Sequence, residues 1–324
     1  MTELPCAPFL SSDAARHGLT KSHLEDLVAA GVVRRPVRGV CARSDLPDTI
    51  ELRAQCTQLV LARHVVASDR LAAWLHGIDS YDLADRELPP DLEVVSIDRH
   101  DRTRREGFLG GKRDLAPDEI CEVCGVLTTT ALRTACDLAC LRGRAAALAV
   151  LDAFMRHHGL TQEDYRRMLP RFKGRRGVKQ LRELINHASR DAESPGESWT
   201  RMTIIDAGIV APVPNVWVEV DDYGWVRLDL AFARLKIAVE YDGEEFHTSE
   251  ADQEHDDARR EALRARGWIV IVVTKHDFTD DRLGAWIGEL RQALRERRPV
   301  AVRRYSRGGW DGPTRRRTAS SKVR

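Results

Sequence analysis

The stretch at residues 227–243 limits the possible folds more than any other part of the chain. Its sequence, RLDLAFARLKIAVEYDG, alternates apolar and other side chains in two successive runs, and a period of two residues is typical of β-strands. A two-residue loop between the runs would make a hairpin in which Ala231 pairs with Ala238. The same register places Asp229 directly opposite Glu240, so the sequence predicts an antiparallel pair with two facing carboxylates.

Facing carboxylates at this position suggest a metal site. Like charges on directly opposed residues, about 4.5–5.5 Å apart, destabilise a sheet. At about 5 Å and an effective dielectric constant near 20, the repulsion would be roughly 3 kcal/mol. A divalent cation would turn this repulsion into binding, and oxygen ligands suit Mg²⁺ or Mn²⁺. Asp242 lies further along the same face. The alternative interpretation is two exposed acids on a solvated face, or one acid with a raised pKa.

Length allows several domains, and the charges are unevenly distributed along the chain. A chain of 324 residues is long enough for two or three domains, and its formal charge of +1 hides acids clustered at 242–257 and bases clustered after Arg295. The N-terminal stretch lacks the basic and apolar regions of a signal peptide. The most apolar predicted strand, at 268–273, is too short to cross a membrane. We therefore expect a cytoplasmic protein without a membrane partner; its oligomeric state does not follow from the sequence.

Four of the seven cysteines have the spacing of zinc ligands. Cys121 and Cys124 form a C-x2-C pair, and Cys136 and Cys140 form a C-x3-C pair. The first pair borders a predicted strand, and the second lies in an apolar predicted helix, where buried free cysteine is common. We therefore do not expect a zinc site.

Residues 1–45 are predicted to form a winged helix-turn-helix. Ser11 or Ser12 would cap a first helix that Gly18 ends, and Thr20 would cap a second helix, before a basic β-hairpin wing at 32–40. The start of a recognition helix usually meets base edges, and arginines of a wing can bind phosphates. The expected DNA contacts are Lys21, Ser22, His23, Arg34, Arg35 and Arg38. Any small helical hairpin could produce the same pattern.

This region resembles the N-terminal winged helix of the AbiE-type antitoxin regulators. The resemblance lies in three motifs of residues 11–40, namely Ala-Ala-x-x-Gly-Leu, Leu-x-x-Leu-Val-x-x-Gly and Arg-x-x-x-Gly-Val. It implies double-stranded DNA as a partner and leaves room for a toxin partner. Residues 46–160 are similar to the module that follows the winged helix in such proteins. We expect a mixed α/β segment there, with helices at 52–66, 69–75, 130–140 and 145–157, a strand at 92–97 and a basic loop at 99–105.

Residues 161–193 are predicted to be a basic helical linker, broken at Pro170 and Gly174, that either contacts nucleic acid or has a solvated face.

Residues 194–296 form the predicted C-terminal domain. Ser194 at the N-cap, Pro195 at the first position and Glu197 at the third are the signals of a helix start, and a capping box alone could explain Glu197. Three strands, a helix, a strand and a helix follow, which gives the order αβββαβα.

The C-terminal region resembles the restriction-endonuclease-like fold, and more closely an uncharacterised domain family allied to the very-short-patch-repair endonucleases. The matching residues are Ser194-Pro195-x-Glu197, Leu228-Asp229-Leu230-Ala231-Phe232, Val239-Glu240-Tyr241-Asp242-Gly243, His247, Asp256-x-x-Arg259-x-x-x-Leu263 and Gly267-Trp268. The resemblance implies that Asp229, Glu240 and the Tyr241 carbonyl hold Mg²⁺ or Mn²⁺, with Glu197 as a further carboxylate.

The sequence does not identify the general base of such a nuclease. Asp242 stands where many nucleases of the broad fold carry a catalytic lysine, although the nearer family also has aspartate there. His247 is the candidate base, because an imidazole accepts a proton near neutral pH. Arg259 could bind phosphate or pair with Asp256, and Lys275 could stabilise charge. Residues 297–324 are predicted to be a disordered basic tail that binds nucleic acid.

The combined prediction is a multidomain α/β protein that hydrolyses DNA phosphodiester bonds with a metal ion and is targeted by its winged helix. The alternative is a DNA-binding transcriptional regulator of the antitoxin type with a non-catalytic nuclease-like domain. An RNA-processing nuclease is a third hypothesis, because acidic residues do not distinguish DNA from RNA.

Overall fold

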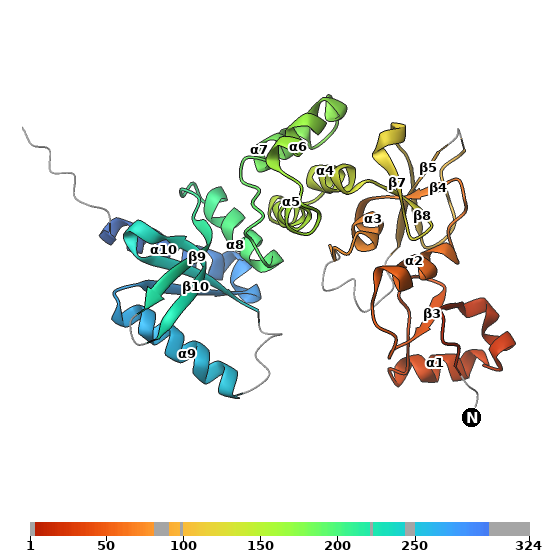
Figure 1. The fold of residues 1–324 in the computed structure, drawn as a ribbon, viewed down its shortest axis with the longest axis horizontal. Coiled ribbons are helices and arrows are strands. Elements are labelled where there is room, and N and C mark those ends of the chain that lie inside the picture. Colours follow the sequence, from red (N-terminus) through yellow and green to blue (C-terminus); the bar gives the residue numbers. More distant parts are fainter. Residues whose placement is uncertain (1–3, 81–90, 98–99, 221–222, 244–249, 298–324) are drawn as a thin grey trace, which may run out of the picture.

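The computed structural model describes residues 4–80, 91–97, 100–220, 223–243 and 250–297, and it shows a mixed α/β chain with three β-sheets (Figure 1). The predictions for Arg99, for His247 and for the tail beyond Arg297 lie outside the described residues. No helix within the described ranges is both long enough and apolar enough to cross a bilayer.

The N-terminal part contains a three-stranded sheet with strand order β1-β3-β2. Its elements are β1 (Phe9–Leu10), the 3-10 helix η1 (Ser11–His17), α1 (Lys21–Ala29), β2 (Val33–Arg34) and β3 (Val40–Arg43). The second predicted helix is confirmed as α1, and the Thr20 hydroxyl caps it by accepting from the His23 N–H at 3.1 Å. The predicted serine cap of the first helix is wrong. That helix starts after Leu10 without a side-chain cap, and the Ser11 N–H instead donates to the Gly39 carbonyl of the wing at 2.9 Å.

The middle part is built on a five-stranded sheet with order β6-β5-β4-β8-β7. Its elements are α2 (Ile50–Gln58), β4 (Val65–Ala67), α3 (Asp69–Leu75), β5 (Leu92–Ser96), β6 (Phe108–Lys112), η3 (Pro117–Glu119), β7 (Ile120–Val123) and β8 (Val126–Thr129). The predicted helix at 52–66 is wrong in its second half, because α2 ends at Gln58 and β4 is the central strand. All three β4 residues are buried, so the segment lacks the alternation that would have distinguished a strand from a helix.

A helical layer follows the middle sheet and includes the segment predicted as a linker. It consists of α4 (Ala131–Leu141), α5 (Arg144–His158), α6 (Gln162–Met168), η4 (Leu169–Phe172) and α7 (Val178–Leu184). The break near Pro170 and Gly174 is confirmed, since α6 gives way to η4 and α7 starts after it. However, Tyr165, Phe172 and Leu181 are at most 1% exposed and share one apolar cluster with α4 and α5. This segment therefore has the packing of a domain core, which an exposed linker would not have.

The C-terminal part is a four-stranded sheet with order β12-β11-β10-β9, in which only β11 and β12 are parallel. Its elements are α8 (Pro195–Asp206), β9 (Val213–Val220), β10 (Gly224–Phe232), η5 (Ala233–Leu235), β11 (Ile237–Asp242), α9 (Glu250–Ala265), β12 (Ile269–Thr274), η6 (Lys275–Phe278) and α10 (Asp280–Arg297). The predicted order αβββαβα is confirmed. Ile204 of α8 and Leu290 of α10 belong to the apolar cluster on one face of the sheet, and Leu263 of α9 to the cluster on the other.

Helix α8 joins the helical layer to the C-terminal sheet (Figure 1). Met202 is buried in the core of α4–α7, whereas Ile204 is buried against the sheet. Asp152 of α5 is 1% exposed and pairs with Arg201 of α8; it also accepts from the Ser198 hydroxyl at 2.7 Å. The first turn of α8, which carries Glu197, is thus held from both sides.

Candidate functional site

The candidate site lies where strands β10 and β11 separate. Their ladder pairs Phe232 with Ile237, Ala231 with Ala238 and Leu230 with Val239, and it ends there. The predicted pairing of Ala231 with Ala238 is confirmed. The connection is longer than the predicted two-residue loop, because residues 233–236 form a 3-10 turn in which Lys236 has a φ of 51°.

Asp229 occupies the first position beyond this ladder. The apolar alternation along β10 breaks around it, since Leu228 packs on the α9 side of the sheet and Leu230 on the α8 and α10 side. Its Oδ2 accepts a hydrogen bond from the Tyr241 N–H at 2.9 Å, in place of a ladder pair with Glu240. Burial raises the pKa of the Asp229 carboxyl to about 7, with further contributions from Glu197 and Glu240 that outweigh the opposing effects of the Tyr241 N–H and Arg259.

Glu240 is 2% exposed and is neutralised by two arginines of α9. The two terminal nitrogens of Arg259 donate to its two carboxylate oxygens, each at 2.8 Å, which is the bidentate geometry that makes such pairs strong. Arg260 lies 3.4 Å from Glu240 and donates to Asp242 at 2.9 Å. The alternative partner predicted for Arg259, Asp256, is 3.5 Å away.

Arg260 is a residue of the site that no sequence pattern indicated. The adjacent arginines of the stretch DARR were visible. Their common acceptors become apparent only once α9 is packed over β11.

Glu197 lies in the first turn of α8, and its side chain is buried. Its Oε2 accepts from the Glu193 N–H at 2.9 Å, one residue before the N-cap, while the Ser194 hydroxyl accepts from the Glu197 N–H at 3.1 Å. Burial raises the pKa of the Glu197 carboxyl. Glu193 in turn pairs with Arg227 of β10 at 2.6 Å. The capping role therefore accounts for part of the bonding of Glu197, and it leaves the repulsion between Glu197 and Asp229 in place.

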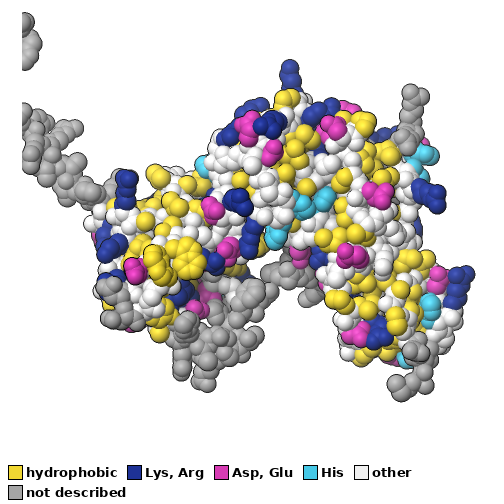
Figure 2. All heavy atoms as spheres, in the orientation of Figure 1, with side chains coloured by type: hydrophobic (Ala, Val, Ile, Leu, Met, Phe, Trp, Pro, Cys, Tyr) yellow, Lys and Arg dark blue, Asp and Glu magenta, His cyan; other side chains and the backbone are white. Residues whose placement is uncertain are grey.

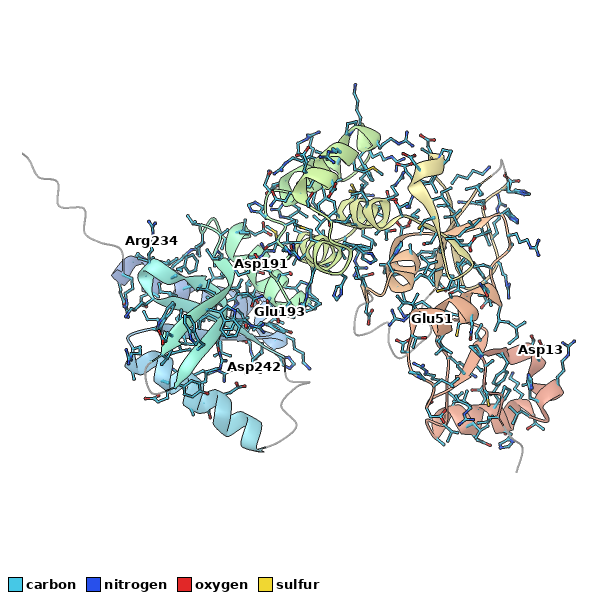
Figure 3. All side chains as sticks on the ribbon, in the orientation of Figure 1. Asp13, Glu51, Asp191, Glu193, Arg234 and Asp242 are labelled. Carbon is cyan, nitrogen blue, oxygen red and sulfur yellow. The ribbon has the colours of Figure 1, made fainter. Side chains whose placement is uncertain are left out.

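Close packing fixes the distance between α8 and β11. A Cβ added to Gly196 would lie 2.1 Å from the Tyr241 ring, so only glycine fits at this helix position. The Tyr241 ring also packs edge-on against Trp199, with the ring centroids 6.4 Å apart. Figure 3 shows Glu193 and Asp242 toward one end of this sheet and Arg234, in the η5 turn, at the opposite end.

The oxygen donors at this site fit a hard cation in their chemistry. Carboxylates of Glu197, Asp229 and Glu240, together with the Tyr241 carbonyl, are ligand types that Mg²⁺ and Mn²⁺ accept. Among the described residues, however, no three His, Cys, Asp or Glu side chains are gathered closely enough to form a ready-made metal site. The four zinc-spaced cysteines all have free thiols. Burial raises the thiol pKa values of Cys121, Cys136 and Cys140.

The predicted DNA contacts of the N-terminal part fall into two groups. Lys21, Ser22 and His23 are exposed at the start of α1, as expected. The three arginines have partners within the chain. Arg34 donates to the Leu46 carbonyl at 2.8 Å, Arg35 pairs with Glu25 at 2.7 Å, and Arg38 pairs with Glu106 and Asp91. In Figure 1 the middle sheet and the helical layer lie between this part and the carboxylates.

Comparison with known proteins gives no functional assignment. No family model matches the chain. Two uncharacterised proteins of Mycobacterium tuberculosis, from the strains CDC 1551 and H37Rv, are each 29% identical over 266 residues. The alignment covers 80% of this chain and 92% of each relative.

Proposed function

We propose that the protein is a metal-dependent endonuclease that hydrolyses DNA phosphodiester bonds in its C-terminal part, which we take to have a restriction-endonuclease-like fold. The observation that carries the proposal is the group of three carboxylates around the fork of β10 and β11, of which Glu197 and Glu240 are buried. Asp229 has its pKa raised to about 7, in part by Glu197 and Glu240. Repulsion among buried acids is unfavourable for stability alone, and perturbed carboxylates cluster at functional sites.

Asp229, Glu240 and the Tyr241 carbonyl would hold Mg²⁺ or Mn²⁺, with Glu197 nearby. When bound, the ion would polarise the scissile phosphate and lower the pKa of an attacking water. The remaining roles belong to residues of the chain. The Tyr241 N–H orients the Asp229 carboxylate. The Glu240 Oε1 accepts from Arg259 alone and keeps a second lone pair, whereas Oε2 accepts from both Arg259 and Arg260, so a metal ion would bind through Oε1.

Two arginines next to the carboxylates would bind phosphates of the DNA. Arg259 and Arg260 are both directed at the site, and guanidinium groups recognise phosphate well. A phosphate that approaches Glu240 and Asp242 would find these cations already in place. His247, the candidate general base, lies outside the described residues.

Nicking of a supercoiled plasmid tests the proposal. The full-length protein would be incubated with Mg²⁺, with Mn²⁺ or with EDTA, next to the variants Asp229→Asn and Glu219→Gln. Glu219 is an exposed acid of the same sheet and serves as the matched control. We expect metal-dependent nicking that Asp229→Asn abolishes and Glu219→Gln retains, while both variants still bind duplex DNA. Equal nicking by Asp229→Asn, or nicking in EDTA, would contradict the assignment.

A second candidate is a DNA-binding regulator of the antitoxin type, in which the C-terminal part binds without cutting. The observation in its favour is that Arg259 and Arg260 both pair with Glu240, so the chain itself balances the charge of this carboxylate. This reading requires a discrete operator whose binding depends on the exposed start of α1. Substituting Lys21 and His23 with alanine should then remove the preference for one sequence, whereas equal binding to all sequences by the unaltered protein would contradict it.

A further inference from the structure

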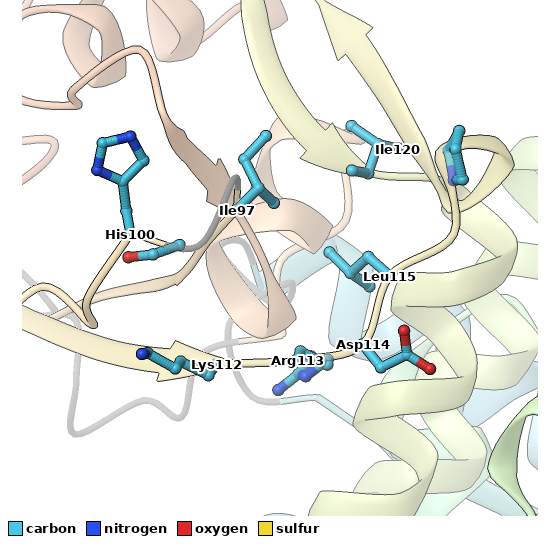
Figure 4. Close-up of a pocket in the computed structure, with 9 residues that line it drawn as sticks. Ile97, His100, Lys112, Arg113, Asp114, Leu115 and Ile120 are labelled. Atoms are coloured by element: carbon cyan, nitrogen blue, oxygen red, sulfur yellow. The ribbon is translucent and has the colours of Figure 1, made fainter.

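A cavity at the edge of the middle sheet is unrelated to the carboxylate site. Its volume is about 590 Å³, which is within the size range of small-molecule pockets (Figure 4). It opens at the carboxyl ends of β5 and β6, two parallel strands in which Ser96 pairs with Lys112. Ligands of α/β sheets typically bind outside the carboxyl ends of parallel strands.

Ser96 gives this cavity an incomplete hydrogen-bond arrangement. It is 8% exposed, and its Oγ is buried without a partner among the described residues. A buried hydroxyl without a partner is unfavourable, so its presence on the cavity wall indicates a group that completes the bond. No sequence pattern indicates a role for Ser96, since its isolation depends on how β5 and β6 pack.

The remaining walls divide into a polar side and an apolar side. Lys112, Arg113, His100 and the carboxylate of Asp114 line the first, and Ile97, Leu115 and Ile120 line the second, as Figure 4 shows. An adjoining cavity of about 360 Å³ shares Arg113 and adds Arg102 and Arg104, which make no ion pair among the described residues. These are the arginines of the predicted basic loop, which the proposed endonuclease function does not use.

Acidic residues near the cavity hold its cations in place. The Arg113 guanidinium donates to both oxygens of Asp69, at 2.9 and 2.8 Å, and to Asp137 at 2.9 Å. Asp69 has a φ of 49°, a left-handed conformation that is rare outside glycine and concentrates at functional sites. Lys112 pairs at 3.0 Å with Asp101, whose side chain is 96% exposed, so a ligand can replace this partner easily.

We propose that this cavity binds a nucleotide, with its phosphates on Lys112, Arg113 and His100 and its base on the apolar wall. The Ser96 hydroxyl would donate to a phosphate or ribose oxygen. A free inorganic anion would leave the apolar wall unused, whereas a nucleotide would use both walls of the cavity. The assignment is independent of the endonuclease proposal, because none of these residues belongs to the carboxylate site.

Titration calorimetry of the full-length protein with ATP tests the proposal. EDTA in the buffer keeps divalent cations from the carboxylates, so nuclease activity does not enter the measurement. We expect saturable binding that Ser96→Ala and Lys112→Gln each weaken about tenfold, the usual effect of losing one hydrogen bond to a charged group. Lys179→Gln, at an exposed position of α7, should bind ATP like the unaltered protein. Ser96→Ala should unfold at the same or a higher temperature, since it removes an unsatisfied hydroxyl.

Four results would overturn this assignment. The first is no saturable binding of ATP at millimolar concentration, and the second is full affinity in both cavity variants. Inorganic phosphate that binds as tightly as ATP would indicate a simple anion site. Duplex DNA that displaces ATP, and that loses affinity in both variants, would assign the surface to a nucleic-acid strand.

Discussion

Replacing Arg259 with leucine should expose how the charge of Glu240 is balanced. Glu240 is 2% exposed, and Arg259 donates to each of its oxygens at 2.8 Å. Breaking a buried pair by removing one partner costs about 3–5 kcal/mol, since a buried charge is left without compensation. Arg260 remains 3.4 Å from Glu240, so we expect the lower end, about 3 kcal/mol.

Urea unfolding followed by tryptophan fluorescence measures this loss where it occurs, because six of the seven tryptophans lie after residue 193. With a slope of about 2 kcal/mol per molar urea, the midpoint should fall by about 1.5 M. Arg264→Leu is the matched control. Arg264 is an exposed residue of the same helix, and its substitution should change the stability by less than about 0.5 kcal/mol.

Mg²⁺ provides the second arm of this experiment. If the ion binds at Glu240, it should restore much of the lost stability, by about 2.7 kcal/mol at one hundred times its dissociation constant. It should stabilise the unaltered protein less, since Arg259 already neutralises Glu240 there. An unchanged midpoint in Arg259→Leu would refute the role of the ion pair. A lowered midpoint that Mg²⁺ does not raise would refute the metal site and leave the ion pair intact.

Three further substitutions test the surroundings of the site. In the folded protein the pKa of Asp229 is raised from its usual 3.8 to about 7. The unaltered protein should therefore lose stability relative to Asp229→Asn as the pH rises from about 4 to about 7, by up to about 4 kcal/mol. Urea unfolding at several pH values measures this difference. Gly196→Ala forces a Cβ against the Tyr241 ring and should cost about 1–3 kcal/mol in the same assay, and an unaltered midpoint would mean that α8 is free to shift. Asp152→Ala leaves the buried Arg201 without its carboxylate partner, so limited proteolysis should cut faster between α7 and α8. An unchanged cleavage rate would argue against a rigid junction.

Local patterns predicted the C-terminal strands and two of the helix caps well. The alternation in residues 227–243 predicted both strands and the pairing of Ala231 with Ala238, and the Ser194 and Thr20 caps are present. These features depend on residues within a few positions of each other, which sequence periodicity records. The same dependence on periodicity explains why the helix predicted at 52–66 was too long. All three residues of β4 are buried, so this strand shows no alternation that could mark it.

The electrostatics of the site could not be predicted in the same way. Facing carboxylates predict either a metal site or acids without one, and neither interpretation includes Arg259 and Arg260, which reach Glu240 from a helix about twenty residues further along the chain. Asp229 bonds to the Tyr241 N–H because the ladder stops at Leu230 and Val239. No pattern in the sequence marks where two strands separate.

The sequence alone determined the order of elements in the C-terminal part, the register of its hairpin and the identity of the acids near the fork. Only the tertiary structure decided which charges are buried together, that residues 161–193 belong to a core, and that Ser96 lies unpaired beside Lys112. The physical reason is that propensity and periodicity act over neighbouring residues, whereas burial and charge compensation depend on segments that meet only when the chain packs.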